Sequence, residues 1–309
     1  MRLCRFLLMG SPAVGFYSEE QIVPLSAVAS ATGTAIPETD SLLPFLPGGS
    51  HAEVGTKLAK AAADGSGAEA AVKTAEATLL VPIARPEKLL LLAGNYAKHI
   101  EEGGGKAEER ANTFPYVFMK PPTTTLTHPG APVKIPAVSP DHVDWECELA
   151  IVIGERCQGV SEADAHKYIA GYTVVNDISD RKFRPNPGRV QREKDTFFDW
   201  QHGKWHNTFC PMGPCITSRE AIPDPQDLKL QLRVNGNIEQ DSSTAEMVFP
   251  VAAVVEFVSS FVTLEPGDVI STGTPAGVGS AKNKFLKPGD VTEAEIEGIG
   301  ILRNPFEAE

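Results

Sequence analysis

Apolar residues in this chain come mostly in short runs that end at a glycine, a proline or a polar turn. Runs of about four to eight apolar residues bounded by such turn signals are typical of β-strands rather than of helices. The runs Leu89–Ala93 and Leu149–Ile153 each stop at a glycine, and we expect both to be buried strands. Two further strands are predicted at 1–9 and 172–176.

Turn signals separate other strands of the predicted fold. Asn235-Gly236 lies inside 232–238 and predicts a strand pair, because Asn-Gly suits the tight turn of a hairpin. Glu-Pro-Gly-Asp at 265–268 and Lys-Pro-Gly-Asp at 287–290 predict tight turns before strands. Helices are predicted at 59–63, 68–77, 95–102, 161–169 and from Pro250 through Val254, Val255 and Val258 to Phe261. Many short strands with scattered helices indicate an α+β fold that is rich in β-structure.

Composition changes along the chain and predicts two domains. Residues 26–77 are rich in alanine, glycine, serine and threonine, and they contain none of the reactive residues found later. Two prolines, Pro82 and Pro86, bracket a short connector. We therefore expect a small N-terminal domain at 1–82 and a larger domain at 83–309 that carries the reactive residues. The apolar part of residues 1–9 is too short for a signal peptide, which favours a first strand.

The charge and the cysteine content exclude several classes of function. A net charge of -12 argues against non-specific binding to nucleic acid or to anionic membranes. No apolar run approaches the roughly 20 residues needed to span a bilayer. Five cysteines without a Cys-x-x-Cys pair indicate reduced thiols and no structural zinc site. We expect a cytoplasmic protein with no nucleic-acid or membrane partner.

The most informative residues are Glu146 and Glu148, at the start of the predicted strand 149–153. Side chains two apart on a strand point to the same face, so both carboxylates are expected in one place. Their burial costs several kcal/mol unless a positive charge neutralises them. A hard divalent cation such as Mg²⁺ suits an all-oxygen site. The alternative is that one glutamate lies in solvent and the other meets an arginine or lysine.

Two further groups fit chemistry at such a site. Asp177 follows the predicted strand 172–176 and supplies a third carboxylate, unless it only caps a turn. His99 and Glu102 are three apart on the predicted helix, so their side chains share a face. A carboxylate that orients an imidazole is the usual arrangement of a general base. The alternative for this pair is a surface histidine beside a solvated glutamate.

These motifs, in their order and spacing, resemble the fumarylacetoacetate hydrolase family over about residues 85–306. The resemblance rests on eight segments: Asn95-Tyr-x-x-His99-x-x-Glu102, Phe118-Met-Lys120-Pro, Asp144-x-Glu146-x-Glu148-Leu-Ala, Gly171-Tyr-Thr-Val-Val-Asn-Asp177, Gly203-Lys204, Cys210-Pro-Met-Gly213-Pro214, Gly267-Asp268 through Thr274 to Gly279, and Leu286-Lys-Pro-Gly289-Asp290. Each segment alone is a weak signal, whereas eight in the right order are specific. The resemblance implies a fumarylacetoacetate hydrolase-like β-roll catalytic domain behind a variable N-terminal domain, and a homodimer.

The resemblance also implies roles for individual residues. It makes Glu146, Glu148 and Asp177 the ligands of Mg²⁺, or of Mn²⁺ or Ca²⁺. It makes His99 and Glu102 the pair that activates water, and Lys204 a cation near the metal and the developing oxyanion. The residues expected to bind a small anionic 2-oxo acid substrate are Lys120, Arg181, Arg184 and Thr274. Cys147 lies between two ligands and is expected to point away from the metal and pack in the core.

One segment departs from the family pattern. Family members often have Arg-Asp-x-Gln after the metal-binding aspartate, whereas this chain has Arg-Lys-Phe-Arg at 181–184. Residues 181–194 contain six basic side chains: Arg181, Lys182, Arg184, Arg189, Arg192 and Lys194. The segment is either a lid that closes over an anionic substrate or a solvated loop. Both interpretations put the substrate that gives the family its name in doubt.

The resemblance and the chemistry favour a divalent-metal-dependent hydrolase that cleaves a C–C bond in a 2,4-dioxo acid, such as an acylpyruvate, through a metal-bound enolate. A first alternative is a decarboxylase, an isomerase or a sugar-acid dehydratase or lyase, because the same site serves each of those reactions. A second alternative is a non-catalytic metal-binding protein. The paired His99 and Glu102 argue against it, since a scaffold has no use for a base beside a metal.

Overall fold

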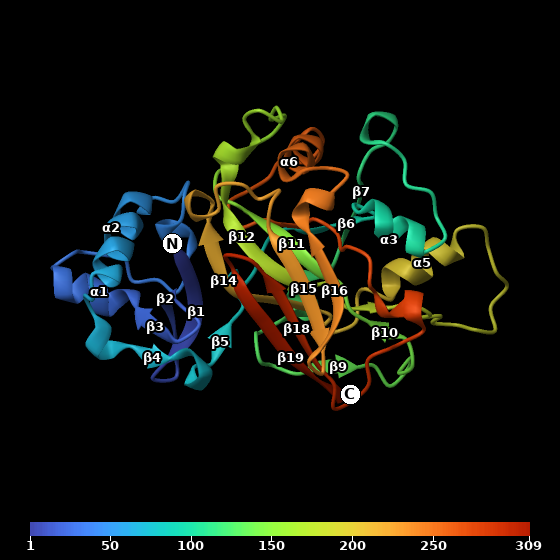
Figure 1. Ribbon diagram of the computed structural model, residues 1–309, viewed down its shortest axis with the longest axis horizontal. Coiled ribbons are helices and arrows are strands. Elements are labelled where there is room, and N and C mark those ends of the chain that lie inside the picture. The colour runs from blue at the N-terminus through green and yellow to red at the C-terminus, as the bar shows by residue number, and fades with distance from the viewer.

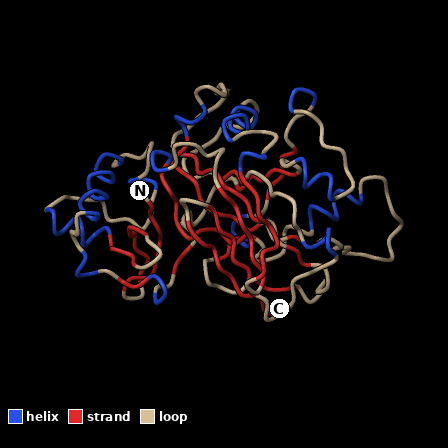
Figure 2. The backbone as a smooth tube through the Cα atoms, in the orientation of Figure 1, coloured by secondary structure: helices blue, strands red, loops and turns tan.

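The computed structural model describes all of residues 1–309. Figure 1 shows an elongated molecule with the N-terminal strands and helices at one end and the remaining sheets at the centre. Strands occupy the middle of the molecule and most helices lie at its periphery (Figure 2). No helix has both the length and the apolar character required to span a bilayer.

The largest sheet runs through most of the molecule. Its strands follow the order β4-β3-β2-β1-β14-β12-β11-β17-β6-β7, with β5 paired to β1 and β8 paired to β14. Their bounds are β1 (Arg2–Leu8), β2 (Ser11–Tyr17), β3 (Gln21–Pro24), β4 (Val72–Lys73), β5 (Leu79–Leu80), β6 (Leu89–Ala93), β7 (Tyr116–Met119), β8 (Leu126–Thr127), β11 (Cys147–Ile153), β12 (Ile169–Asn176), β14 (Cys210–Ser218) and β17 (Val269–Ser271). Because β1 pairs with β14, the N-terminal strands continue the sheet of the catalytic part. The domain boundary at residue 82 stays a prediction.

Two smaller sheets complete the β-structure. A five-stranded sheet has the order β16-β15-β18-β19-β9, and a two-stranded ribbon joins β10 to β13. Their bounds are β9 (Val133–Ile135), β10 (Val143–Asp144), β13 (Ser179–Asp180), β15 (Lys229–Val234), β16 (Asn237–Ser243), β18 (Val291–Ile296) and β19 (Gly300–Ala308). The predicted hairpin is present, since Asn235 and Gly236 both adopt positive φ between β15 and β16.

The helices are few and short. They are α1 (Leu25–Thr32), α2 (Ala52–Ala63), α3 (Ala97–Glu102), α4 (Pro122–Thr125), α5 (Asp195–His202) and α6 (Val251–Ser259). The fold is therefore the predicted β-rich α+β type.

Side chains along β11 alternate between two buried faces of the large sheet. Leu149, Ile151 and Ile153 belong to the core between the large sheet and the five-stranded sheet. Ala150 and Val152 belong to a second core on the opposite face, under α1 and α2. Side chains alternate between faces along a strand, so Glu146 and Glu148 share the face of Ala150. Cys147 lies in the first core, where it points away from the carboxylates as predicted.

Three predicted helices differ from the structure. Residues 68–77 form two 3₁₀ turns around the short strand β4 instead of an α-helix, because Val72 pairs with Ile22 and tertiary pairing overrides alanine's helix propensity. Residues 161–169 contain only the 3₁₀ helix η5 (Ala165–Tyr168), since Ile169 begins β12. The helix after Pro250 ends at Ser259, which leaves Phe261 outside it and exposed.

Candidate active site

The three predicted metal ligands meet where β11 and β12 lie side by side. Glu148 faces Val175 and Cys147 faces Asn176 across the strand pair, and Glu146 and Asp177 are the residues just beyond that last pair. The Asp177 N–H donates to the Glu146 carbonyl at 2.8 Å. One carboxylate oxygen from each residue lies within 4.8 Å of the other two, and all three side chains are buried. The strand register therefore builds the cluster that the Glu-x-Glu spacing predicted.

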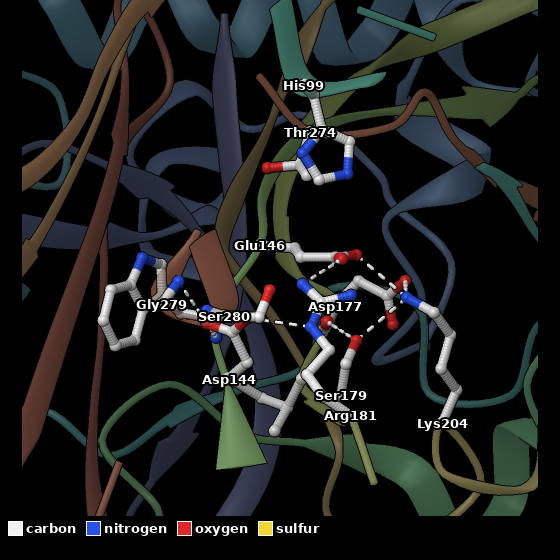
Figure 3. A network of polar contacts seen from close by, with 12 residues as sticks. His99, Asp144, Glu146, Asp177, Ser179, Arg181, Lys204, Thr274, Gly279 and Ser280 are labelled. Carbon is white, nitrogen blue, oxygen red and sulfur yellow. Dashed lines mark hydrogen bonds and ion pairs between the residues drawn. The ribbon is translucent and has the colours of Figure 1, made fainter. Parts of the chain in front are cut away.

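Two basic side chains contact Glu146 (Figure 3). Lys204 Nζ lies 2.9 Å from Glu146 Oε2 and 2.6 Å from Asp177 Oδ2. Arg181 Nη2 forms an ion pair with Glu146 Oε1 at 2.6 Å. Burial alone would raise the pKa of Glu146, but the charges of Lys204 and Arg181 outweigh burial and hold that pKa well below its usual range.

Lys204 is held in this position by its surroundings. The ammonium group also donates to Ser179 Oγ at 2.9 Å. It lies over the rings of Phe118 and Trp200, at 5.1 and 5.6 Å from their centroids. Burial would lower the pKa of Lys204, but the carboxylates of Asp177 and Glu146 reverse the shift and raise it. Lys204 therefore keeps its positive charge at the site.

Glu148 is the member of the cluster without a cationic partner. Its Oε2 accepts from Ser271 Oγ at 2.6 Å and from the Gly273 N–H at 3.0 Å. Its Oε1 is buried and has no hydrogen-bonding partner. Burial, followed by the negative charges of Asp177 and Glu146, raises the pKa of Glu148 well above its usual range. A buried carboxylate oxygen without a partner costs free energy.

This donor set fits a divalent cation. Three convergent carboxylates offer only oxygen ligands, which hard cations such as Mg²⁺, Mn²⁺ and Ca²⁺ prefer. The unpartnered oxygen of Glu148 points to the same requirement, because a cation there would satisfy it. Glu146, Glu148 and Asp177 are therefore the residues that could hold the metal.

His99 and Glu102 lie next to the carboxylates, on α3. His99 Nδ1 lies 2.8 Å from Glu102 Oε1, and the Gly277 N–H donates to Glu102 Oε2 at 2.9 Å. Burial would raise the pKa of Glu102, but the bonds from His99 and the Gly277 N–H outweigh burial and lower it. With Nδ1 turned toward the carboxylate, Nε2 of His99 is the nitrogen left for a substrate proton. This is the geometry expected of a general base.

A small cavity joins the base to the carboxylates. Its volume is about 60 Å³, and it is lined by Leu92, Ala93, Gly94, His99, Glu146, Glu148, Arg181, Trp200, Lys204 and Thr274. His99 and Thr274 lie on the same side of Glu146 in Figure 3. A larger hollow of about 680 Å³ shares His99, Arg181 and Trp200 with the cavity and also reaches Glu102. The hollow therefore lies beside the cavity, on the side of the base.

Thr274 is placed at this cavity, but its hydroxyl is already engaged. It donates to the Cys147 carbonyl at 3.0 Å and accepts from Gln240 Nε2 at 2.8 Å. Binding of a substrate carboxylate by this hydroxyl would need one of these bonds to be exchanged. Thr274 follows Gly273, whose φ of 88° and close neighbours favour glycine at this position.

Lys120 lies behind Asp177 rather than at the cavity. It is fully buried, forms an ion pair with Asp177 and donates to the Ile178 carbonyl at 2.8 Å and to the Phe209 carbonyl at 2.5 Å. It does not line the cavity at the carboxylates. These contacts fix the Asp177 carboxylate. The predicted role of Lys120 in substrate binding stays a prediction.

Sequence reasoning missed Asp144 and Gln240 as functional residues. Asp144 is fully buried, and its carboxylate accepts from Arg181 Nε at 2.8 Å. Gln240 accepts from the Cys147 N–H at 3.0 Å and so connects β16 to the strand of the carboxylates. The sequence does contain a signal for Asp144. It lies two residues before Glu146, so on an extended strand its side chain points to the same face as those of the two glutamates. Gln240 lies in a polar strand with no such signal.

Comparison with known proteins agrees with this geometry. The family described as fumarylacetoacetate (FAA) hydrolase, C-terminal, matches residues 88–307. The chain belongs to this family. It is 40% identical over 230 residues to the mitochondrial oxaloacetate tautomerase of Xenopus laevis, an alignment that covers 74% of this chain and 68% of that protein. The predicted family and fold class are confirmed.

Two solved structures cover nearly the whole of both chains. Fumarylacetoacetate hydrolase from psychrophilic Exiguobacterium antarcticum is 30% identical, with a TM-score of 0.78 and 100% of each chain covered. Maleylpyruvate hydrolase from Sphingobium sp. SYK-6 was solved with a manganese(II) ion and pyruvate. It is 28% identical, with a TM-score of 0.75 and 100% of this chain and 99% of that chain covered. Both are named as hydrolases, and one of them binds a divalent metal.

Proposed function

We propose that the chain is a divalent-metal-dependent hydrolase that cleaves a C–C bond in a 2,4-dioxo acid such as an acylpyruvate. The observation that carries the proposal is the shared cavity, because it places an oriented base, His99, beside the buried carboxylates Glu146 and Glu148. A binding protein needs the carboxylates but not the base. The base therefore supports catalysis over the non-catalytic alternative.

Glu146, Glu148 and Asp177 would hold Mg²⁺, with Mn²⁺ or Ca²⁺ as the other candidates. The manganese bound in the maleylpyruvate hydrolase supports a divalent metal in this family and leaves the choice of metal here a proposal. When bound, the cation supplies Lewis-acid stabilisation of the negative charge that develops on the 2-oxo acid. Every other step belongs to side chains of the protein.

His99 would take a proton from water at Nε2, while Glu102 stabilises the imidazolium that forms. The resulting hydroxide attacks the carbonyl at C4 of the substrate. Lys204 offsets the negative charge that builds up on that oxygen. The bond between C3 and C4 then breaks, its electron pair goes to the pyruvyl half, and His99 returns the proton to C3. The products are pyruvate and a carboxylic acid.

Keto–enol tautomerisation of oxaloacetate is a second candidate, and a specific observation favours it. The relative from Xenopus laevis has that activity in its name and is 40% identical to this chain. The same base would move a proton between C3 and the keto oxygen without any attack by water. Decarboxylation, isomerisation and sugar-acid dehydration use related steps and remain further alternatives.

The test is a comparison of two substrates on the Mg²⁺-loaded protein. Acetylpyruvate cleavage is measured by the pyruvate released, and oxaloacetate tautomerisation is measured by loss of enol absorbance. We expect cleavage of acetylpyruvate that is lost in His99→Ala and Glu148→Ala. Tautomerisation of oxaloacetate without release of pyruvate from any of several acylpyruvates would overturn the hydrolase proposal and support the second candidate.

The assembly and the compartment stay predictions. A homodimer is supported by the edge strand β7, whose Tyr116 is 64% exposed, and sedimentation equilibrium tests it. A cytoplasmic location stays open, because the Xenopus laevis relative is mitochondrial. The lack of nucleic-acid and membrane partners also stays a prediction, based on the net charge and on the absence of a long apolar run.

A further inference from the structure

Gln240 closes a ring of hydrogen bonds around the backbone of Cys147, the residue between the two glutamates of the site. Its Oε1 accepts from the Cys147 N–H at 3.0 Å, and its Nε2 donates to Thr274 Oγ1 at 2.8 Å. The Thr274 hydroxyl in turn donates to the Cys147 carbonyl at 3.0 Å. All three residues are buried, so the ring is shielded from bulk solvent.

The partners of Gln240 determine which end of its amide is the oxygen. The Cys147 N–H can only donate, so the atom that it faces must be Oε1. The Pro275 carbonyl can only accept, and Gln240 Nε2 donates to it at 2.8 Å. A flipped amide would set two N–H groups against each other and two carbonyl oxygens against each other. The amide therefore has one orientation, in which Nε2 is the donor to Thr274.

This orientation decides what the Thr274 hydroxyl can do. A hydroxyl has one proton to donate and two lone pairs that accept. Its proton must point to the Cys147 carbonyl, because Gln240 Nε2 donates and cannot accept. One lone pair accepts from Gln240, and the other is left over. Toward the cavity that it lines, Thr274 can therefore act only as a hydrogen-bond acceptor.

Attack by water requires a second acceptor beside His99. The attack uses a lone pair of the water oxygen, so both protons of the water must be directed to acceptors, and His99 Nε2 is one of them. The cavity, about 60 Å³ in volume, is large enough for water. Its other polar side chains are donors or proposed metal ligands: Arg181, Trp200 and Lys204 donate, and Glu146 and Glu148 would hold the metal. Thr274 is the side chain left to accept, and it lies on the same side of Glu146 as His99 (Figure 3).

We propose that Gln240 is a positioning residue that holds Thr274 as an acceptor for the attacking water. The water donates to His99 Nε2 and to Thr274 Oγ1, which leaves a lone pair to attack C4 of the substrate. His99 removes the first proton, and the second stays on the oxygen that bonds to C4. Without Gln240, the hydroxyl would be free to turn its proton toward that lone pair and oppose the attack. The inference rests on the proposed function, since it needs a reaction in which water attacks.

The test measures acetylpyruvate cleavage by the Mg²⁺-loaded protein in Gln240→Met, Thr274→Val and the double variant. Methionine resembles glutamine in length but has no amide, and valine replaces the hydroxyl with a methyl group. Thr274→Ser is the conservative variant, because it keeps the hydroxyl. Gln226→Met is the matched control, because the Gln226 amide also joins two backbone groups, the Thr244 carbonyl and the Val251 N–H, but does not line the cavity.

We expect kcat to fall roughly threefold to tenfold in Gln240→Met and in Thr274→Val, because one neutral hydrogen bond to the water is misdirected or lost. The double variant should have the kcat of Thr274→Val, because Gln240 acts through Thr274 and the two losses are not additive. Thr274→Ser and Gln226→Met should keep the kcat of the wild type.

A merely structural role of Gln240 would affect other measurements. If Gln240 only fixed the Cys147 backbone between the two glutamates, Gln240→Met would weaken the binding of Mg²⁺, which calorimetry with Mg²⁺ alone measures. Exchange of the C3 protons of pyruvate for deuterium uses His99 but no attack by water. In Gln240→Met we therefore expect unchanged Mg²⁺ affinity and KM, and a smaller loss of deuterium exchange than of cleavage.

The two proposals fail in different ways. A Gln240→Met variant with the kcat of the wild type, weakened Mg²⁺ binding, or a double variant in which the two losses multiply would overturn the role of Gln240 and leave the hydrolase proposal standing. If the wild type cleaves no acylpyruvate, the hydrolase proposal is wrong, and the role of Gln240 in orienting water is wrong with it.

Discussion

Arg181 joins two buried carboxylates: its Nε donates to Asp144 Oδ2 at 2.8 Å, and its Nη2 lies 2.6 Å from Glu146 Oε1. Asp144 also accepts from the backbone N–H groups of Gly279 at 2.6 Å and Ser280 at 2.9 Å. One aspartate thus connects the strand of Glu146 and Glu148, the start of the basic segment and the glycine-rich loop. Figure 3 shows this arrangement around Asp144.

Asp144→Asn should destabilise the protein, because it removes the charge that Arg181 and three backbone N–H groups, those of Trp145, Gly279 and Ser280, face in a buried site. Loss of one partner of a buried ion pair costs about 3–5 kcal/mol, and the isosteric amide keeps some hydrogen bonds, so we expect about 3 kcal/mol. Denaturant unfolding measures the change. Asp141→Asn is the control, because Asp141 is exposed three residues away. A loss for Asp144→Asn no larger than for the control would contradict this account.

Mg²⁺ should stabilise the protein more at pH 8 than at pH 6. The folded-state pKa of Glu148 is raised by burial and by its acidic neighbours. In the metal-free protein, Glu148 contributes stability through its protonated form. This contribution is complete below the pKa that the carboxyl has in the unfolded protein, and it is lost as pH rises toward the pKa that it has in the folded protein. The cation binds only ionised Glu148. Between the unfolded-state and folded-state pKa values, a higher pH therefore strengthens binding of the cation.

Melting temperatures with and without Mg²⁺ across this pH range measure the effect, and calorimetry in buffers of different ionisation enthalpy should show release of a proton on binding. Glu148→Gln should weaken Mg²⁺ binding and remove the released proton. Equal stabilisation by Mg²⁺ at pH 6 and pH 8 would show that Glu148 is already ionised in the metal-free protein.

Much of this site could be predicted from the sequence because its signals are local. The period of two along β11 puts Glu146 and Glu148 on one face and Cys147 on the other, and the structure has this arrangement. The spacing of His99 and Glu102 along a helix likewise predicts their contact, which is 2.8 Å long. In both cases the backbone geometry of a single element determines which side chains meet.

The parts that could not be predicted depend on partners far along the chain. Lys120 carries a motif signal, but only tertiary packing shows that it lies behind Asp177 and contacts the Phe209 carbonyl. Residues 68–77 have a high helix propensity, yet pairing of β4 with β3 makes an α-helix impossible there. The basic segment is a similar case, since carboxylates of α5 decide which of its charges remain free.

His99→Ala should lower kcat by roughly 10²–10⁴-fold, the usual range for a general base. Glu102→Gln should lower kcat less, because the amide still contacts the imidazole but no longer stabilises its charged form. The lowered pKa of Glu102 keeps that carboxylate ionised below the usual range of glutamate. The stability it gives is therefore present above its unfolded pKa and is lost only as pH falls through the lower folded value.

Measurement of kcat for wild type, Glu102→Gln and His99→Ala tests this order. We expect the kcat of Glu102→Gln to lie between those of wild type and His99→Ala, because the amide still positions the imidazole but carries no charge. A Glu102→Gln variant with the kcat of wild type would mean that Glu102 does not act on His99.

Gly277→Ala should impair both folding and catalysis, because this glycine has two roles. Its φ is 106°, which side-chain-bearing residues rarely adopt, and a Cβ there would lie 2.2 Å from the Glu239 carbonyl oxygen. Its N–H also donates to Glu102 at 2.9 Å. Relief of the clash must move this backbone, and with it the donor that positions Glu102 and, through it, His99.

Gly289→Ala is the matched control, because Gly289 has a φ of 94° and no atom within 4 Å of the position that a Cβ would take. Gly289→Ala should lose only the stability that a side-chain-bearing residue costs at positive φ, about 1–2 kcal/mol. It should keep the kcat of the wild type. Gly277→Ala should lose more stability than the control in denaturant unfolding, and its kcat should fall while metal binding is kept. Equal losses of stability in the two variants, with kcat unchanged in both, would show that the close approach at Gly277 is relieved without moving Glu102.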